Sequence, residues 1–404
     1  MNYLRSHTSA SERLFTRRQT LLLGLGGLTG LGASTLAHQF MNPSFNLTQP
    51  TLNPPTLNNF NFASLGNTPL RQRAANKGLI YGAAVRQYAV SSDTQFAQAV
   101  VRECAMIVPE WELKWNFLRP TPSTFDFGPA DWLFNFAQTN GLLFRGHTLI
   151  WHEVGALPQW FGSVVNFRNA RQLFLDHITT VVNHYRGRIH SWDVVNEAIH
   201  IPDGRSNGLR NTPWLNWLGE DYINLAFRTA AQADPNAMLV YNDYGLDYDT
   251  PQDEAKRNAV LRLLERLKAQ GTPIHALGIQ AHLIGGETRF NAQKLRNFLT
   301  EVANLGLKIL ITEIDVTDNQ LPINIQARDQ TVAGVYQDYL ATVLNERAVV
   351  AVLNWGLSDR YTWLTEFAAR SDQAPVRPLP LDDQMQRKLA WNAMSNAFNN
   401  APLR

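Results

Sequence analysis

The chain has 404 residues, of which 45% are hydrophobic, 17% charged and 10% aromatic. This composition is typical of a globular protein and excludes a disordered or membranous chain. The formal net charge is +2, with 36 Lys+Arg and 34 Asp+Glu; four arginines and one glutamate lie in the first 37 residues, so the remainder holds 32 basic and 33 acidic residues. This balance gives no sign of the clustered basic face that nucleic-acid binding needs. A neutral polysaccharide suits such a chain, although many other substrates do too.

The N-terminal segment has the features of an export signal. Arg17 and Arg18 precede an apolar run, rich in leucine and glycine, that extends to Leu36. Paired arginines before a modestly hydrophobic stretch are typical of a twin-arginine signal, and the small residues before His38 suit a signal peptidase. An ordinary secretory signal is an alternative, whereas a permanent membrane anchor is disfavoured because a spanning helix needs about 20 apolar residues. We therefore expect residues 1–37 to direct export to the periplasm or beyond.

The rest of the chain divides into a linker and one folded domain. Residues 38–72 are rich in asparagine, proline and threonine without a sustained hydrophobic period, which predicts a linker. Residues 73–400 form the expected folded domain. Cys104 is the only cysteine, so an intramolecular disulfide is impossible. It lies in an apolar stretch, which predicts a buried structural thiol and not a catalytic one.

Strand-like and helix-like patterns alternate through this domain. Short apolar runs predict strands at 79–85, 105–108, 143–149, 189–195, 237–241, 276–280, 307–311 and 349–353. Helical patterns lie between them, including 94–103, 168–185, 223–233, 253–270, 292–305 and 326–344. The alternative is a doubly wound open sheet, but no Gly-rich phosphate turn follows the first strand. The fold class is therefore α/β, a single (β/α)8 TIM barrel preceded by a signal peptide and a linker.

Polar and aromatic side chains gather where these strands end. Seven consecutive strand ends carry them, at 110–115, 147–152, 196–197, 242–244, 280–282, 313–315 and 355–359. Catalysis in such barrels occurs at the carboxyl ends of the strands. Two of these ends deliver glutamates, Glu197 and Glu313, and a carboxylate pair is what cleavage of a glycosidic bond requires. The pattern predicts a retaining glycoside hydrolase; a strand-end salt bridge is the structural alternative for either glutamate.

Several motifs, spread from Gly78 to Trp391, resemble family 10 of the glycoside hydrolases, the (β/α)8 endo-β-1,4-xylanases. The motifs are 145–152 (RGHTLIWH), 192–198 (WDVVNEA), 241–244 (YNDY), 312–315 (TEID) and 355–360 (WGLSDR). The resemblance implies that residues 73–400 are the catalytic domain of an enzyme that hydrolyses xylan. It also implies Glu197 as the acid/base and Glu313 as the nucleophile, about 5 Å apart, with the pKa of the acid raised by its like-charged neighbour.

The resemblance also implies supporting and substrate-binding residues. His282 and Asp315 are expected to orient Glu313 and keep it ionised, Asn196 to bond the sugar 2-hydroxyl, and Gln280 to contact Glu197 or the same sugar. Residues expected to bind substrate are Glu110, Lys114, His147, Trp151, Tyr244, Trp355 and Trp363. Lys114 has a solvated surface charge as its alternative. Trp132 and Trp391 are expected in the core.

Departures from the family pattern bear on substrate choice. Trp111 stands where the family usually has an asparagine that helps hold the second sugar from the cleavage point. Gly245 stands where the family often has asparagine on the leaving-group side, and the loop 153–157 is longer than usual. A relative tuned to another β-linked glycan or to short oligosaccharides is therefore the enzymatic alternative. A carbohydrate-binding protein without catalysis is disfavoured because both glutamates are present.

Partners follow from this interpretation. We expect a polysaccharide substrate, no cofactor, no nucleic acid, no permanent membrane anchor and a monomer. His147, His152, His282 and Glu313 could be considered as metal ligands, but their spacing lacks a metal-binding helix motif or cysteine pairs. The tryptophans around them indicate sugar binding instead.

Overall fold

The computed structural model describes Phe62 and residues 66–404. All of them belong to one compact unit, residues 57–404. The predicted export signal and most of the predicted linker lie outside the described residues. The first described helix begins at Leu70, inside the range predicted as linker, where the Leu70 side chain is fully buried and its N–H donates to Glu103.

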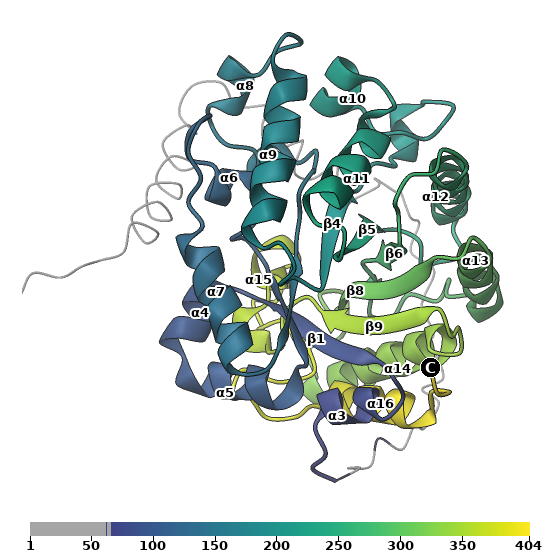
Figure 1. Ribbon diagram of the computed structural model, residues 1–404. Helices are drawn as coiled ribbons and strands as arrows, with labels where there is room; N and C mark the ends of the chain where they lie inside the picture. Colours follow the sequence, from purple (N-terminus) through teal and green to yellow (C-terminus); the bar gives the residue numbers. More distant parts are fainter. Residues whose placement is uncertain (1–61, 63–65) are drawn as a thin grey trace, which may run out of the picture. The chain divides into compact units, whose positions relative to one another are not determined.

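The strands form a closed parallel barrel, as predicted (Figure 1). The described residues contain nine strands: β1 (Ile80–Val85), β2 (Met106–Pro109), β3 (Leu143–Gly146), β4 (Ser191–Asn196), β5 (Met238–Asp243), β6 (Ala276–Ile279), β7 (His282–Ile284), β8 (Lys308–Thr317) and β9 (Val349–Asn354). β1 pairs with both β2 and β9, and β6 pairs with β8, which closes the ring of eight strands. β7 is a short extra strand beside β8.

Two strands differ from their predicted ranges in ways that matter for the site. β8 runs on to Thr317, so Glu313 and Asp315 lie within a strand and not after it. β6 ends at Ile279, and the chain resumes as β7 at His282. Ala281 between them has a left-handed φ of 61°. That conformation is unusual for a residue with a side chain, and such residues concentrate at functional sites.

Helices surround the strands in Figure 1. Their bounds are α3 (Leu70–Ala75), α4 (Gln87–Ser92), α5 (Thr94–Glu103), α6 (Trp115–Leu118), α7 (Gly128–Thr139), α8 (Phe161–Val164), α9 (Ala170–His184), α10 (Pro213–Leu218), α11 (Tyr222–Ala233), α12 (Pro251–Ala269), α13 (Ala292–Asn304), α14 (Ile325–Val343), α15 (Leu364–Phe367) and α16 (Leu389–Asn400). Three 3-10 turns join them, η1 (Val154–Ala156), η2 (Ile201–Asp203) and η3 (Asp359–Tyr361).

The ends of α12 show side-chain capping and charges that suit the helix dipole. α12 begins with Thr250, whose hydroxyl accepts from the N–H of Asp253 at 3.0 Å, and with Pro251 in the first turn. Arg266 and Lys268 lie in its last turn, where cations offset the helix dipole. The six predicted helices are confirmed to within a few residues. α7 and α16 were not predicted, because α7 opens on Gly-Pro and α16 is rich in asparagine, and both residue types weaken the helical pattern.

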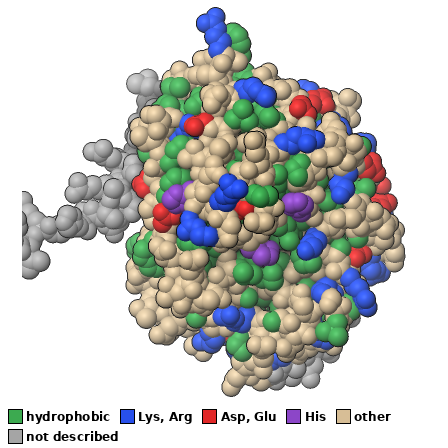
Figure 2. Space-filling view, viewed as in Figure 1, with side chains coloured by type: hydrophobic (Ala, Val, Ile, Leu, Met, Phe, Trp, Pro, Cys, Tyr) green, Lys and Arg blue, Asp and Glu red, His purple; other side chains and the backbone are tan. Residues whose placement is uncertain are grey.

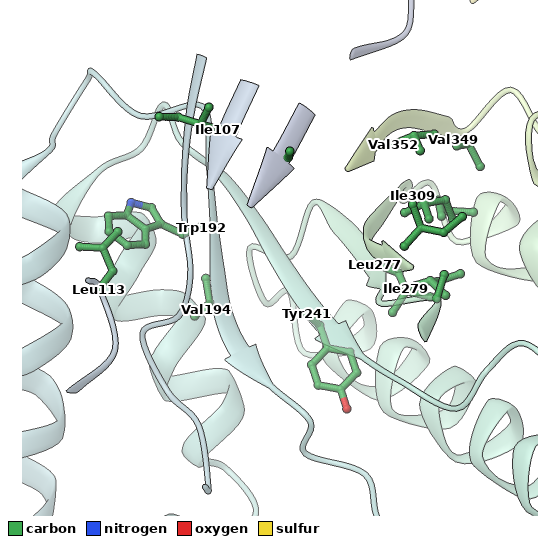
Figure 3. Close-up of a cluster of buried hydrophobic side chains, with 14 of the residues drawn as sticks. Ile107, Leu113, Trp192, Val194, Tyr241, Leu277, Ile279, Ile309, Val349 and Val352 are labelled. Atoms are coloured by element: carbon green, nitrogen blue, oxygen red, sulfur yellow. The ribbon is translucent and has the colours of Figure 1, made fainter. Parts of the chain in front are cut away.

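Side chains alternate between two hydrophobic layers. Inside the barrel lie Ala84, Met106, Val108, Val240, Ala276, Leu310, Ala351, Leu353 and Trp355. Outside it, a larger layer packs strands against helices; Figure 3 shows part of this layer, including Trp192, Tyr241 and Ile309. Trp391 is buried in it, as predicted. The prediction for Trp132 is wrong: it is 38% exposed and stacks on Phe136 along the outer side of α7.

The surface charges, the helix lengths and the single cysteine are the remaining features of the fold. On the face shown in Figure 2, lysine and arginine side chains lie in separate spots among uncharged atoms. Among the described residues, no helix is both long and apolar enough to cross a bilayer. Cys104 is a buried free thiol, as predicted, and burial raises its pKa.

Candidate active site

Glu197 directly follows β4 at the carboxyl end of the barrel. Its φ is 57°, and its N–H donates to the carbonyl of Asn242 on the neighbouring β5 at 2.8 Å. Oε1 accepts hydrogen bonds from Asn196 Nδ2 at 3.1 Å and from Gln280 Nε2 at 3.0 Å. Oε2 lies 3.9 Å from Nδ1 of His152. The two amides thus hold Oε1 of Glu197 in place.

Glu313 lies on β8, and the side chains of Asn242 and His282 contact its carboxylate. Asn242 donates to its Oε1 at 2.7 Å, and Nε2 of His282 lies 3.4 Å from its Oε2. Nδ1 of His282 bonds Asp315 Oδ1 at 2.9 Å. The indole N–H of Trp363 donates to the other Asp315 oxygen at 2.7 Å. The structure therefore brings His282 and Asp315 together with Glu313, in the chain of contacts that was expected.

Charge keeps Glu313 ionised. Burial would lower the pKa of His282, but the adjoining Asp315 and Glu313 raise it to about 10, so His282 is a cation at neutral pH. Burial alone would raise the pKa of Glu313. The His282 hydrogen bond, the charges of His147 and His282, and the Asn242 amide together lower it below its ordinary value. An ionised carboxylate held in this way can attack an electrophilic carbon.

The expected rise in the pKa of Glu197 is not found. Burial raises this pKa, but the imidazole of His152, the guanidinium of Arg210 and the Gln280 amide outweigh it, and the net direction is downward. Burial lowers the pKa of His152 itself to about 4, so His152 is neutral at neutral pH. Arg210 is then the charge of this pair that persists beside Glu197.

Asn242 joins the two glutamates, and sequence reasoning assigned it no role. Its amide nitrogen donates to Glu313 Oε1 and, at 2.8 Å, to Oδ1 of Asn196. The amide nitrogen of Asn196 in turn donates to Glu197. Its oxygen accepts from Thr312 at 2.7 Å. Gly278 makes room for this amide, because a Cβ there would lie 2.3 Å from Asn242 Oδ1. A buried polar residue at the end of β5 was the available signal.

A second buried chain orients His147. Its Nδ1 lies 3.0 Å from Asp193 Oδ2, and the guanidinium of Arg145 hydrogen-bonds the other Asp193 oxygen. The carboxylate at Nδ1 fixes the orientation of the His147 ring. Asp193 and Arg145 stood in quoted motifs, yet their role depends on pairing between β3 and β4.

Lys114 sits in an aromatic cage. Its ammonium lies 4.2 Å from the ring centre of Trp111, 5.0 Å from that of Trp151 and 5.7 Å from that of Trp355. It is 5% exposed, so the alternative of a solvated surface charge is wrong. Burial lowers the pKa of Lys114, and the charges of Glu110, Glu313 and Glu197 partly oppose that shift.

Trp111 therefore lies against cleft residues and not beneath the neighbouring loop. Its indole is half-buried and lies 5.8 Å from the exposed ring of Phe117. The adjacent Glu110 accepts from Arg86 at 2.6 Å, so its free oxygen is the one available to a ligand. The other departure, Gly245, has a left-handed φ of 64°, which glycine and asparagine both tolerate.

The remaining expected substrate residues line the same end of the barrel. Trp355 lies 5.1 Å from His147, and Trp363 lies 5.1 Å from His282, ring centre to ring centre. The buried indole N–H of Trp151 faces Glu197 and helps to lower the pKa of that carboxyl. Tyr244 accepts a hydrogen bond from Arg210 at 2.9 Å. Aromatic walls with polar groups between them can bind a sugar by stacking and hydrogen bonding.

Within the described ranges, no cluster of three or more His, Cys, Asp or Glu side chains has the arrangement of a metal site. His147 is engaged by Asp193, and His282 by Asp315.

Comparison with known proteins gives the family. The model of glycosyl hydrolase family 10 matches residues 69–397. An endo-1,4-beta-xylanase 1 from Humicola insolens is 34% identical over 342 residues, covering 83% of this chain and 76% of that protein. A beta-1,4-xylanase from Dictyoglomus thermophilum is 36% identical over 294 residues, covering 70% and 79%.

Solved structures agree. Xylanase 10B from Thermotoga maritima has a TM-score of 0.74 at 31% identity and covers 82% of this chain and 98% of its own. Xylanase 10B from Thermotoga petrophila, solved with xylobiose, has a TM-score of 0.74 at 30% identity, with 83% and 98% covered. The fold, the pair of strand-end glutamates and these matches lead to one conclusion: the chain belongs to glycosyl hydrolase family 10.

Proposed function

We propose that this protein is an endo-β-1,4-xylanase that cleaves xylan with retention of anomeric configuration. One observation carries the proposal: the carboxylates of Glu197 and Glu313 are coupled through Asn196 and Asn242 in a buried network between three barrel strands. This network fixes two carboxyl groups relative to each other, as a two-step displacement requires. The family and the xylanases similar to this chain support xylan as the substrate.

In the first step, Glu313 attacks the anomeric carbon while the glycosidic bond breaks. The pKa of Glu313 is lowered, so it is ionised and ready to attack. Glu197 gives its proton to the departing oxygen. A covalent bond now joins the sugar to Glu313, and Glu197 is a carboxylate.

In the second step, Glu197 acts as the base. It takes a proton from water, and the resulting oxygen displaces Glu313 from the anomeric carbon. Two inversions give net retention. Asn196, beside Glu197, is placed to bond the 2-hydroxyl of the sugar, and Gln280 holds Glu197 in position.

We assign the cleft around Lys114 to the non-reducing side of the cleavage point. Glu110, Lys114, His147, Trp151, Trp355 and Trp363 supply its polar contacts and stacking surfaces. Tyr244 lines the leaving-group side. Trp111 favours a second candidate function, a preference for short oligosaccharides or another β-linked glycan, because an indole cannot reproduce the paired hydrogen bonds of an amide.

Product analysis tests the proposed function. Purified protein incubated with xylan, mixed-linkage glucan and cellulose should release oligosaccharides from xylan first. NMR of the fresh product should show the β-anomer before mutarotation. Early release of the α-anomer would contradict the retaining mechanism, and faster cleavage of glucan or cellulose would contradict the substrate.

We further propose that the protein is exported by the twin-arginine route and acts as a monomer outside the cytoplasm. Arg17 and Arg18 before an apolar run support the route. The segment 1–37 keeps its proposed role as signal, and the part of 38–72 that precedes α3 keeps its proposed role as spacer.

A further inference from the structure

We propose that Arg210 positions the acid/base Glu197 and maintains a permanent positive charge beside its carboxylate. This role rests on the function proposed above. It adds a residue that none of the quoted motifs contains.

The chain after β4 turns back on itself and places Arg210 next to Glu197. Ile199 and Leu209 pair as an antiparallel bridge, and the N–H of Arg210 donates to the carbonyl of Ala198 at 2.7 Å. The nine residues between the bridge partners carry the chain out and return it to the strand end. A residue 13 positions from Glu197 in sequence is thereby held against it.

The guanidinium of Arg210 contacts the main chain of Glu197. Its Nε donates to the Glu197 carbonyl at 2.8 Å, and one terminal nitrogen donates to the Tyr244 hydroxyl at 2.9 Å. Arg210 is 3% exposed. Glu197 has a left-handed φ of 57°, a conformation that side-chain-bearing residues adopt only when their surroundings hold them there. The Arg210 hydrogen bond is one of the contacts that holds it.

Arg210 lacks a carboxylate partner at ion-pair distance among the described residues. Burial lowers the pKa of Arg210. The Tyr244 hydroxyl, the Glu197 carboxylate and Asp243 outweigh burial, so the net pKa is raised above its ordinary value. Asp243, which also acts on Arg210, is otherwise engaged, because its Oδ1 pairs with Lys256 at 2.6 Å. Lys256 also lies 3.4 Å from the ring centre of Tyr244. Glu197 is therefore a principal counter-charge of a buried arginine.

Other charged groups face Glu197 as well. His152 lies 3.9 Å from its Oε2 and is neutral above about pH 4, where its lowered pKa falls. Lys114 is a cation on the sugar side that also faces Glu313. Glu313 reaches Glu197 through the asparagine pair and loses its charge when it bonds the sugar. The charge of Arg210 changes neither with pH in this range nor when Glu313 bonds the sugar.

This arrangement favours the carboxylate form of Glu197. The acid gives its proton to the glycosidic oxygen in the first step and recovers one from water in the second. Arg210 stabilises the carboxylate that exists between those events. It does so without touching the sugar, so we describe it as a positioning residue.

The pH profile of an Arg210→Gln variant tests the proposal. The alkaline limb of kcat/KM reports loss of the proton on Glu197. Removal of a neighbouring cation should shift that limb to higher pH by about one unit. Arg210→Lys should return it to the wild-type position. Arg257→Gln is the matched control, because Arg257 is also buried and donates to the main-chain carbonyls of Leu246 and Tyr248; its limb should stay in place.

Leaving-group dependence gives a second measurement. Phenyl xylobioside needs protonation of its leaving oxygen, whereas dinitrophenyl xylobioside does not. Both Arg210 variants should lose more turnover on the phenyl substrate than on the dinitrophenyl substrate. If the glutamine variant does not fold, this comparison in the lysine variant decides the test. Equal losses on both substrates, or an unmoved limb in a folded glutamine variant, would overturn the proposal. Wild-type inactivity on xylan would instead refute the substrate assignment and leave this test intact.

Discussion

The side-chain amide of Asn242 donates a 2.7 Å hydrogen bond to Oε1 of Glu313. The same nitrogen donates to Asn196, and the amide oxygen accepts from Thr312, so every polar atom of this side chain is engaged. Because the amide is uncharged, it orients Glu313 without adding a charge beside the Glu313–His282 pair. Because this buried amide has several hydrogen-bond partners, its replacement should have a measurable effect.

Asn242→Asp should raise the pKa of Glu313, because it places a second negative charge against a carboxylate that must be ionised. The acid limb of kcat/KM should move to higher pH by about one unit, with kcat reduced about tenfold or more. Thr312→Val, which removes a neighbouring hydrogen bond without adding charge, serves as the control and should leave the limb in place. An unchanged limb in the aspartate variant would contradict the role assigned to Asn242.

Trp111→Asn should alter substrate preference. The indole lies against Lys114 at the edge of the cleft, and a lost stacked contact costs on the order of 1 kcal/mol, about fivefold in rate. The ratio of activity on xylotriose to activity on long xylan should change, with little effect on an aryl monoglycoside. Phe117→Ala removes the exposed neighbouring ring and provides the comparison. A variant that melts earlier yet keeps every substrate ratio would show that Trp111 serves stability alone.

His282 should make thermal stability depend on pH in the alkaline range. The pKa of His282 is raised to about 10 in the folded state, whereas a histidine in the unfolded chain has a pKa of about 6.5. A raised pKa stabilises the folded state fully below the unfolded value, and this contribution is lost as pH rises towards 10. Melting temperature should therefore fall over this range, and His282→Asn should flatten the decline. Parallel curves for the two proteins would count against a cationic His282.

Replacement of both Arg17 and Arg18 by lysine should leave precursor in the cytoplasm, because the twin-arginine receptor reads the arginine pair. Fractionation and immunoblotting would measure the retained form. The matched variant Arg5→Lys lies outside the pair and should be exported normally. Normal export of the double variant would indicate the ordinary secretory route.

The barrel could be predicted from the sequence, and the two glutamates of the proposed catalytic pair could be located, because both have local signals. Apolar runs define β4 and β8, and the residues at or near their ends are Glu197 and Glu313. Asn242 and Arg210 could not be assigned roles in the same way. Asn242 matters because β5 lies beside β4 and its side chain reaches across to β8, and Arg210 matters because a loop returns to the strand end.

Exposure and protonation were harder to predict than position. Trp132 was expected in the core because it is large and apolar, yet its turn of α7 faces solvent. The pKa of Glu197 was expected to rise from its proximity to Glu313. It is lowered instead because burial is outweighed by cations and amide donors that lie far apart in sequence. Such balances depend on three-dimensional neighbours.

The account depends most on Glu313 as the nucleophile. Glu313→Ala should abolish xylan hydrolysis, and azide should restore turnover of an activated aryl β-xylobioside by entering the vacated space. Direct attack there must invert the configuration, so the product should be the α-glycosyl azide. Glu197→Ala is the matched control: azide then intercepts the glycosyl-enzyme and should give the β-glycosyl azide. A β-azide from the Glu313 variant would contradict the assignment of the nucleophile.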